Sequence, residues 1–409
     1  MISFEPSEDQ ALMAAEVAAF ARTVLRPKIR HFEGTRAVSD DVRNAAHGLG
    51  LGMAALPEQV GGAGLGMTTA VLLEEELGWG DAGAAFALGG PGAFGFAVAE
   101  LGTTEEARTA LEPFTARAHT GAVAWGESKS HPEKAGFTTR AVYTDGNYTL
   151  DGEKAYVVNA DRADVFVVFA SVENTSQGYR GLGAFVVPKD TRGLTVLPRA
   201  TTLGLDAASF GGIALKGVVV PKSARLSGAS DFDAALIRFF AKHALVVAAR
   251  SVGLGRAALE STIAYVDERK AFGKPIGHFQ AVAFNVADRA IDVDASRALV
   301  LRAAAAWDAR DANPSDAAKE RDALLLTAQA VATTHEATMR CGNDAVQLYG
   351  GAGFMRDYLV EKFMRDARQL SLCTMTAEHA DQLAAAVELG IPLDPACVLP
   401  TPDTQNAFV

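Results

Sequence analysis

The spacing of apolar residues changes twice along the chain, and this change constrains the fold more than any other feature. From Ser7 to about His119, apolar residues recur at three- and four-residue steps, as they do in helices. Between roughly Gly121 and Leu226, short runs of branched residues predict strands. From Phe232 to about Leu389 the pattern is again helical and rich in alanine. Helices, then strands, then helices predict an α+β chain with segregated α and β domains.

The two changes divide the chain into three domains and a tail. A chain of 409 residues is long enough for two or three domains. We predict an N-terminal helical domain over residues 1–119 and a small central antiparallel β domain over 120–227. A C-terminal helical domain that resembles a four-helix bundle is predicted over 228–390, followed by an irregular, proline-rich tail over 391–409.

Local signals set the expected ends of several elements. Ser7 resembles an N-cap, and Pro27 is expected to break the first helix. Asp145-Gly146 and Asp151-Gly152 are typical of tight hairpin turns. The richest strand runs are 165–170, 184–187 and 213–220, and the breaks in the last helical region are Gly273-Lys274-Pro275, Asn313-Pro314 and Gly350-Gly351.

Eighteen positions from Ala82 to Ala99 carry no charge, which reaches the minimum length of a membrane-spanning helix. This segment is rich in glycine and is interrupted at Gly89-Gly90-Pro91, so it fits a buried helical segment with a break, and we expect no membrane span. We also expect Gly89 to Phe96 to line a substrate pocket.

The charge and the cysteine content of the chain restrict which classes of partner, metal site and cell compartment we expect. A net charge of −11 without a basic run disfavours nucleic acid or an anionic membrane as a partner. Three cysteines provide neither a disulfide framework nor a metal cluster, and the N-terminus lacks the features of a signal peptide. We therefore predict a cytoplasmic protein without a bound metal.

Two C-terminal blocks carry a family resemblance. The first runs from Glu268 to Ile276 (ERKAFGKPI) and continues to Phe279-Gln280. The second runs from Gln347 to Phe354 (QLYGGAGF) and leads to Arg365-Asp366-Ala367-Arg368. Together with the order of the domains, these blocks resemble the acyl-CoA dehydrogenase family, whose members are oligomeric FAD enzymes.

The chemistry of these residues suits a dinucleotide. Arg269 offers a cation for a pyrophosphate, Phe272 offers a stacking face, and Gly350-Gly351 permits close approach of backbone N–H groups to an anion. Taken singly, Arg269 also fits a surface salt bridge, and the glycine pair also fits a helix stop. The resemblance implies that Arg269, Phe272, Gln280, Gln347, Gly350 and Gly351 contact the adenosine diphosphate part of a neighbouring subunit's FAD.

The resemblance also implies a reaction, in which a carboxylate removes the α-proton of an acyl thioester while a hydride leaves the β-carbon for the flavin. Ungapped alignment from Arg365 places Thr374 where most members have the catalytic Glu. Some members carry the Glu on an earlier helix, at the position of His243. His243 is a candidate base or an ordinary helical histidine, and Glu378 is a candidate base or a first-turn helix carboxylate.

The segments that would hold the flavin ring depart from the family pattern. The loop at 126–133 keeps only Glu127, and the family's Trp-Ile-Thr-Asn segment reads Tyr156-Val157-Val158-Asn159. The aromatic ring is kept at Tyr156, whereas the hydroxyl is lost at Val158. We keep Glu127, Tyr156 and Val158, together with Thr376, as candidate FAD contacts.

These departures leave three hypotheses. The first is an oxidoreductase that acts on the CH–CH group of an acyl-CoA or other acyl thioester, with a substituted base and an acceptor such as an electron-transfer flavoprotein. The second is a non-catalytic subunit that completes the FAD site of a catalytic paralogue, so that the assembly is a homotetramer or a hetero-oligomer. The third is an oxygenase or oxidase in which the polar loop Ser128 to His131 forms part of an altered pocket.

Overall fold

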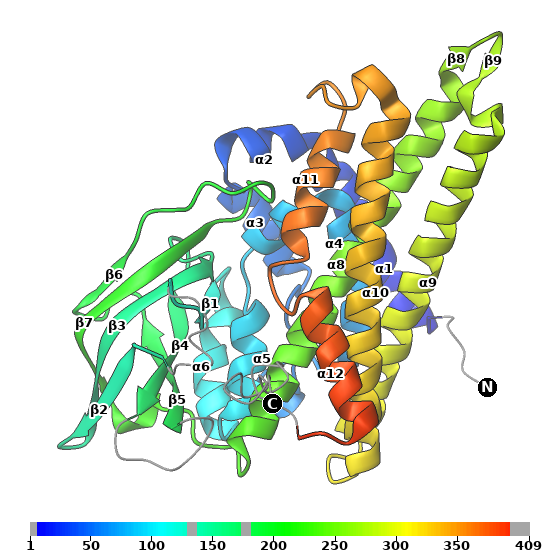
Figure 1. Cartoon of the computed structure of the whole chain (residues 1–409). Helices are drawn as coiled ribbons and strands as arrows, with labels where there is room; N and C mark the ends of the chain where they lie inside the picture. The colour runs from blue at the N-terminus through cyan, green and yellow to red at the C-terminus, as the bar shows by residue number, and fades with distance from the viewer. Residues whose placement is uncertain (1–5, 129–136, 173–180, 393–409) are drawn as a thin grey trace, which may run out of the picture.

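The computed structural model describes residues 6–128, 137–172 and 181–392. Figure 1 shows three layers, with the β sheet on one side, the long C-terminal helices on the other and most of the N-terminal helices between them. The α+β class is therefore confirmed, with one helical region before the β domain along the chain and one after it. The predicted 391–409 tail, apart from its first two residues, and the polar loop Ser128 to His131, apart from Ser128, lie outside the described residues.

The N-terminal helices begin at a capping box, in which Ser7 and Gln10 bond reciprocally, as the sequence predicts. The α-helix ends at Phe20, and Pro27 lies in a 3-10 turn between α1 and α2, so the chain tightens at the proline without a complete break. The break at Gly89-Gly90 separates α4 from α5. The helices of this region are α1 (Glu8–Phe20), α2 (Ile29–Thr35), α3 (Asp40–Gly48), α4 (Gly66–Ala87), α5 (Gly92–Leu101) and α6 (Thr104–Ala116).

The central sheet has seven strands within the described residues. They are β1 (Gly121–Ala124), β2 (Arg140–Thr144), β3 (Asn147–Val158), β4 (Val165–Val172), β5 (Leu182–Pro188), β6 (Leu194–Val196) and β7 (Phe210–Pro221). Most strand pairs are antiparallel, as predicted, but β4 pairs in parallel with both β1 and β2. The chain between β1 and β4 contains the entire β2–β3 hairpin, which is long enough for a parallel crossover.

The two expected hairpin turns have different outcomes. Asp145 and Gly146 both have positive φ and join β2 to β3, as predicted. Asp151-Gly152 is not a turn but lies inside β3, at a shift in its register with β7. A Cβ at Gly152 would lie 2.5 Å from the Thr139 backbone, so the glycine permits close approach of two chain segments within the sheet domain.

The C-terminal region consists of long helices and one short hairpin. They are α8 (Phe232–Glu268), β8 (Lys270–Ala271), β9 (Lys274–Pro275), α9 (Gln280–Asp311), α10 (Ala317–Tyr349), α11 (Val360–Leu370) and α12 (Ala377–Leu389). Tyr265 of α8 stacks on Tyr349 of α10 with ring centroids 3.9 Å apart. The C-terminal ends of α8 and α10 therefore lie side by side.

Helices α4 and α8 pack closely enough to join the two helical regions. A Cβ on Gly78 would lie 2.2 Å from the backbone oxygen of Arg250, and one on Gly253 would lie 1.9 Å from that of Glu75. Only glycine fits at these crossings, so the two backbones are fixed relative to each other. In the part of the chain that the structure describes, no helix has the length and apolarity needed to cross a membrane.

Candidate active site

A cavity of about 550 Å³ lies where both helical regions meet the sheet. Its walls come from α4, α5, β1, β3, α8 and the loop between α11 and α12. The segment Gly89 to Phe96 lines it, as the sequence predicts. The candidate residues on the wall are Tyr156, Val158, His243 and Thr374, and Glu74, Asn159, Arg250 and His379 join them.

His243 lies in the middle of a helical stripe that faces the cavity. The stripe consists of Phe239, His243, Val246 and Arg250, whose spacing of three and four residues places them on one face of α8. Burial, helped by the positive charge of Arg250, lowers the pKa of His243 to about 4. The imidazole is therefore neutral at pH 7 and has a lone pair available to accept a proton.

Thr374 lies on the loop that follows α11, at the same cavity. Its buried hydroxyl oxygen has no hydrogen-bond partner among the described residues. The neighbouring Cys373 also lines the cavity, and burial raises the pKa of its thiol to about 12, so it remains a neutral thiol. An orphaned hydroxyl next to open space is a place where a ligand can supply the missing partner.

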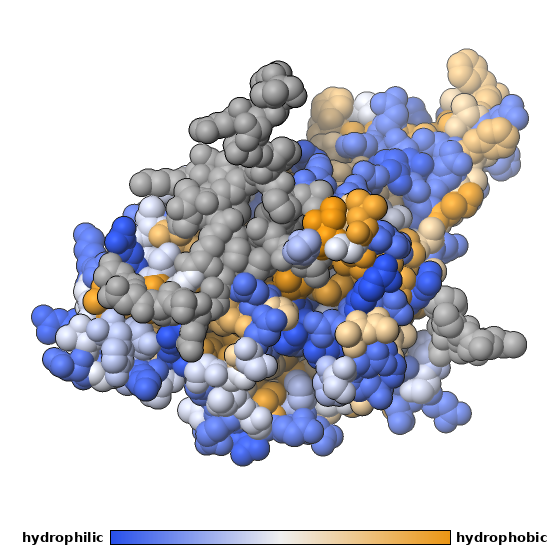
Figure 2. All heavy atoms as spheres, turned by 60° about the horizontal axis from the view of Figure 1, so that its bottom comes forward, coloured by the Kyte–Doolittle hydropathy of each residue, from blue (hydrophilic) through white to orange (hydrophobic). Residues whose placement is uncertain are grey.

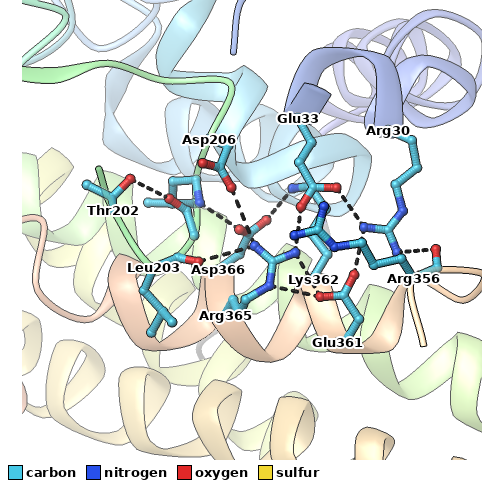
Figure 3. Close-up of polar contacts among 12 residues, drawn as sticks. Arg30, Glu33, Thr202, Leu203, Asp206, Arg356, Glu361, Lys362, Arg365 and Asp366 are labelled. Atoms are coloured by element: carbon cyan, nitrogen blue, oxygen red, sulfur yellow. Dashed lines mark hydrogen bonds and ion pairs between the residues drawn. The ribbon is translucent and has the colours of Figure 1, made fainter. Parts of the chain in front are cut away.

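A polar network holds the helix that leads into this loop (Figure 3). Arg365 of α11 contacts Glu33 of α2 at 2.5 Å, Glu361 at 2.8 Å and Asp206 of the segment between β6 and β7 at 3.4 Å. Arg30 reinforces it through Glu361 at 2.7 Å. The cluster draws on all three parts of the chain.

A second, fully buried group lies beside the first. Lys362 contacts Asp81 at 3.1 Å and also pairs with Asp366, which accepts the backbone N–H of Leu205 at 2.7 Å. Asp81 has non-helical φ and ψ within α4, so the kink in α4 coincides with this contact. Burial raises the pKa of Asp366, whereas the ammonium of Lys362 opposes that rise. Together the two clusters fix the base of the loop that carries Thr374.

The other two candidates near this loop are differently placed. Glu378 is exposed on the first turn of α12 and is not on the cavity wall. Thr376 is the N-cap of α12, where its hydroxyl accepts the N–H of His379 at 3.3 Å. The geometry thus favours the helix-terminal interpretation of Glu378 over its use as a base.

Strand β3 contributes the residues opposite the loop. Tyr156 has a φ of 59° and is 72% exposed, so its ring projects from the strand. Asn159 donates to the carbonyl of Phe86 at 2.7 Å, whereas its own side-chain oxygen is buried without a partner in the described chain. Val158 lines the cavity without a hydroxyl to offer a ligand.

The Glu127 side chain is committed within the sheet domain. Its carboxylate accepts hydrogen bonds from Thr138 and Thr139 and pairs with the buried Lys154 at 3.1 Å. Burial acts to raise the pKa of Glu127, but the Thr138 hydrogen bond and the charge of Lys154 bring it down to about 2. The side chain is thus held by Thr138, Thr139 and Lys154, and a contact of Glu127 with FAD stays a prediction that concerns its backbone.

The remaining candidates gather at the other end of α8, in a group that we call the tip. Phe272 is 97% exposed in the β8–β9 hairpin that follows α8, and the stacked Tyr265 and Tyr349 bring the end of α10 next to the end of α8. In Figure 2, apolar residues gather at the upper right, where Figure 1 places β8 and β9. The exposed members of the tip are Arg269, Phe272, Gln280, Gln347, Gly350 and Gly351.

The cavity and the tip are far apart within one chain. At about 1.5 Å per residue, about 39 Å of helix axis separates His243 from Arg269. The structure thus brings the candidate residues together as two sets instead of one. Within the described residues, no group of three or more His, Cys, Asp or Glu side chains is arranged to hold a metal ion.

The residues present fit FAD in two respects. The cavity offers the orphaned polar atoms of Thr374 and Asn159 and the projecting ring of Tyr156. The tip offers an exposed arginine, an exposed aromatic ring and two glycines around which nothing lies within 4 Å of an added Cβ. A flavin ring needs the first kind of surface, and a pyrophosphate with an adenine needs the second.

Comparison with known proteins identifies the family. Residues 7–118, 122–218 and 233–379 match the N-terminal, middle and C-terminal domain models of acyl-CoA dehydrogenase. The probable acyl-CoA dehydrogenase YngJ of Bacillus subtilis is 30% identical over 92% of this chain and 97% of its own length. The chain belongs to the acyl-CoA dehydrogenase family of FAD-dependent oxidoreductases.

Further relatives and solved structures agree. Cyclohex-1-ene-1-carbonyl-CoA dehydrogenase of Geobacter metallireducens is 29% identical over 90% of this chain and 95% of its own. The butyryl-CoA dehydrogenase structure from Megasphaera elsdenii superimposes with a TM-score of 0.85 at 26% identity and covers 95% of this chain and all of its own. An FAD complex of PigA has the same TM-score at 25% identity, covering 95% of this chain and all of its own.

Sequence reasoning missed the ion pair between Glu74 and Arg250 on the cavity wall. Arg250 donates through Nε to Glu74 at 2.6 Å, and its guanidinium lies 4.5 Å from the centroid of the Phe86 ring. The available signal was a single arginine within the apolar run from Ala244 to Gly255 of α8. A charge in such a run has to be paired or face a polar site.

Proposed function

We propose that this chain is an acyl thioester dehydrogenase in which His243 accepts the α-proton. When bound, FAD would supply the hydride acceptor. The single observation that carries the proposal is a neutral, buried imidazole on the wall of the same cavity as Thr374. Because the carboxylate of most family members is absent at Thr374, the proton needs another acceptor, and a neutral imidazole can be one.

The remaining residues of the chain would bind and orient the substrate. The aromatic side chains of Trp125, Phe239 and Phe240 line the cavity and exclude water from an acyl group. A low pKa makes His243 a weaker base than one matched to neutral pH, so proton removal is expected to be slower than with a base of ideal pKa.

The tip supports oligomerisation as part of this proposal. Residues that suit a pyrophosphate and adenine lie about 39 Å along α8 from the chain's own cavity, so we assign them to the FAD of a second subunit. Large apolar side chains remain exposed in the same region, on Ile263, Phe284, Ile291 and Phe354. Such surface is typical of an interface, and we propose a homo-oligomer that passes electrons to an acceptor such as an electron-transfer flavoprotein. A cytoplasmic location remains a prediction that rests on the cysteine content of the chain.

Anaerobic flavin reduction by a panel of acyl-CoAs tests the proposal. His243→Gln should slow reduction by about 10²- to 10⁴-fold, the usual contribution of a general base. His335 is the matched control, because it is also a buried helical histidine with a pKa lowered by burial to about 4, yet it is not on the cavity wall. His335→Gln should leave the reduction rate unchanged.

Two outcomes would redirect the assignment. An unchanged rate in His243→Gln would exclude this residue as the base. A purified protein whose flavin no thioester reduces would favour the non-catalytic subunit, an alternative that the threonine at position 374 supports. In that case the partner to look for is a paralogue with an intact catalytic Glu.

A further inference from the structure

The Glu74–Arg250 pair lies on a buried part of the cavity wall, where α4 meets α8. Glu74 is 9% and Arg250 8% exposed, and the neighbouring lining residues Ala70 and Leu73 are also buried. By contrast, Tyr156 on the opposite wall is 72% exposed. Arg250 is therefore a buried cation on the wall of the space available to an acyl group.

The guanidinium of Arg250 is only partly used by the protein. Nε donates to Glu74 at 2.6 Å, and one face lies against the Phe86 ring. The two terminal nitrogens make no hydrogen bond to the described residues, and neither is sealed from the cavity space. One edge of a nine-tenths buried guanidinium is thus free, and two parallel N–H groups along such an edge match the two oxygens of a carboxylate.

The position of Arg250 relative to His243 suits an acyl chain that spans the two. They are separated by two turns of α8 on the face that lines the cavity, about 10 Å along the axis. The backbone of Arg250 is fixed in position, because it packs directly on Gly78 of α4. A substrate whose α-carbon lies at His243 would therefore have a fixed cation within reach of its far end.

We propose that Arg250 determines specificity by binding a carboxylate at the far end of the acyl group. The preferred substrate class is then a monothioester of a dicarboxylic acid, and this inference rests on the proposed function. Glu74 holds the guanidinium in place through Nε, while its negative charge limits how tightly a second carboxylate binds. A plain fatty acyl group would leave the free edge of Arg250 unpaired in a dry cavity, which is unfavourable.

Equilibrium dialysis of the FAD-loaded protein, performed without oxygen, compares glutaryl-CoA with valeryl-CoA, which share a five-carbon chain. The protein should bind glutaryl-CoA about tenfold more tightly, as expected for one charge-assisted pair. Arg250→Lys keeps a partner for Glu74 but lacks the two-nitrogen edge, so it should lose most of this preference. Glu74→Gln keeps the guanidinium and removes the competing charge, so it should increase the preference.

The double variant Glu74→Gln/Arg250→Met is a control for misfolding, because it removes both charges and leaves none of them unpaired. It should bind valeryl-CoA at least as well as glutaryl-CoA and should retain a cooperative melting transition. Equal binding of the two thioesters by the unmodified protein, or an unchanged preference in Arg250→Lys, would overturn this inference alone. Binding of neither thioester would overturn the proposed function and this inference with it.

Discussion

The two ends of α8 retain the family pattern to different degrees. At the tip, the ERKAFGKPI block and the glycine pair at Gly350-Gly351 are intact. At the cavity, Thr374 replaces the usual Glu, and Val158 replaces a threonine. About 39 Å of helix axis separates the two regions, so the residues that we propose hold a dinucleotide and those that we propose carry out chemistry are physically separable. One set can change without disturbing the other.

The largest effect is expected when the tip and the cavity are inactivated in two separate variants. Arg269→Ala should abolish FAD retention, because the tip loses its exposed cation for the pyrophosphate. Mixing this variant with His243→Gln during refolding or co-expression pairs an intact cavity with an intact tip across a subunit boundary. Random symmetric pairing should restore about a quarter of the activity, measured as flavin reduction by an acyl-CoA.

Arg108→Ala controls for the loss of an exposed arginine elsewhere, on α6, and should retain FAD. Absence of any restored activity in mixed assemblies, with both variants folded and assembled, would show that the cavity and the tip do not serve one site across subunits. The separation that defines the comparison would then have no functional meaning.

Removing the ion pairs that hold α11 near the cavity should lower the free energy of unfolding substantially. Arg365→Ala leaves Glu33 and Glu361 without one of their partners and should destabilise the protein by about 3 kcal/mol, the lower range for breaking a buried ion pair. Arg340→Ala, in a more exposed pair with Asp292, should cost about 1 kcal/mol or less. Urea denaturation followed by circular dichroism measures both.

Equal stability losses in these two variants would mean that the network of Figure 3 is no stronger than a surface pair. The loop of Thr374 would then need another explanation for its fixed position. A larger loss for Arg365→Ala, accompanied by weaker acyl-CoA binding, would instead tie the network to the geometry of the cavity.

The sequence predicted best those features of the fold that depend on local residue patterns. Periodicity located the helices and strands, and the Asp145-Gly146 turn was correct because its backbone demands are local. Asp151-Gly152 has the same residue types but lies inside β3, where packing against Thr139 decides the conformation. Parallel pairing of β1 with β4 was missed for the same reason, since strand order is a long-range property.

The features of the candidate site also differ in whether local sequence or tertiary packing determines them. Motif matching identified His243 and Thr374, which the structure places at one cavity, but it could not show that the Glu127 carboxylate is paired with Lys154. Nor could it pair Glu74 with Arg250, because the contact joins α4 to α8 across a gap of many residues. Charges that meet only through tertiary packing leave no periodic signal in the sequence.

Acid should destabilise the protein through His243. Its pKa is about 4 in the folded chain and about 6.5 in an unfolded chain, so above pH 6.5 the imidazole is neutral in both states and the residue adds no pH dependence. Between pH 6.5 and 4 the unfolded chain binds the proton first, which lowers the free energy of unfolding by about 3 kcal/mol in total. His243→Gln should therefore flatten the stability profile within this window.

His335→Gln should flatten the profile to a similar extent, because burial also lowers the pKa of His335 to about 4. Only His243→Gln should also slow flavin reduction, by about 10²- to 10⁴-fold. A folded-state titration of His243 near 6.5, followed by NMR, would contradict the burial on which this prediction depends and would leave the imidazole partly charged at neutral pH.

The smallest effect is expected at Glu378, which distinguishes a carboxylate near the site in sequence from one in the cavity. It is exposed on the first turn of α12, where backbone N–H groups and the Thr376 hydroxyl lower its pKa. Glu378→Gln should therefore change the rate of flavin reduction by about twofold or less, as for an ordinary surface substitution. A loss as large as that of His243→Gln would mean that α12 rearranges to bring Glu378 into the cavity, and the carboxylate mechanism of the family would return by a different residue.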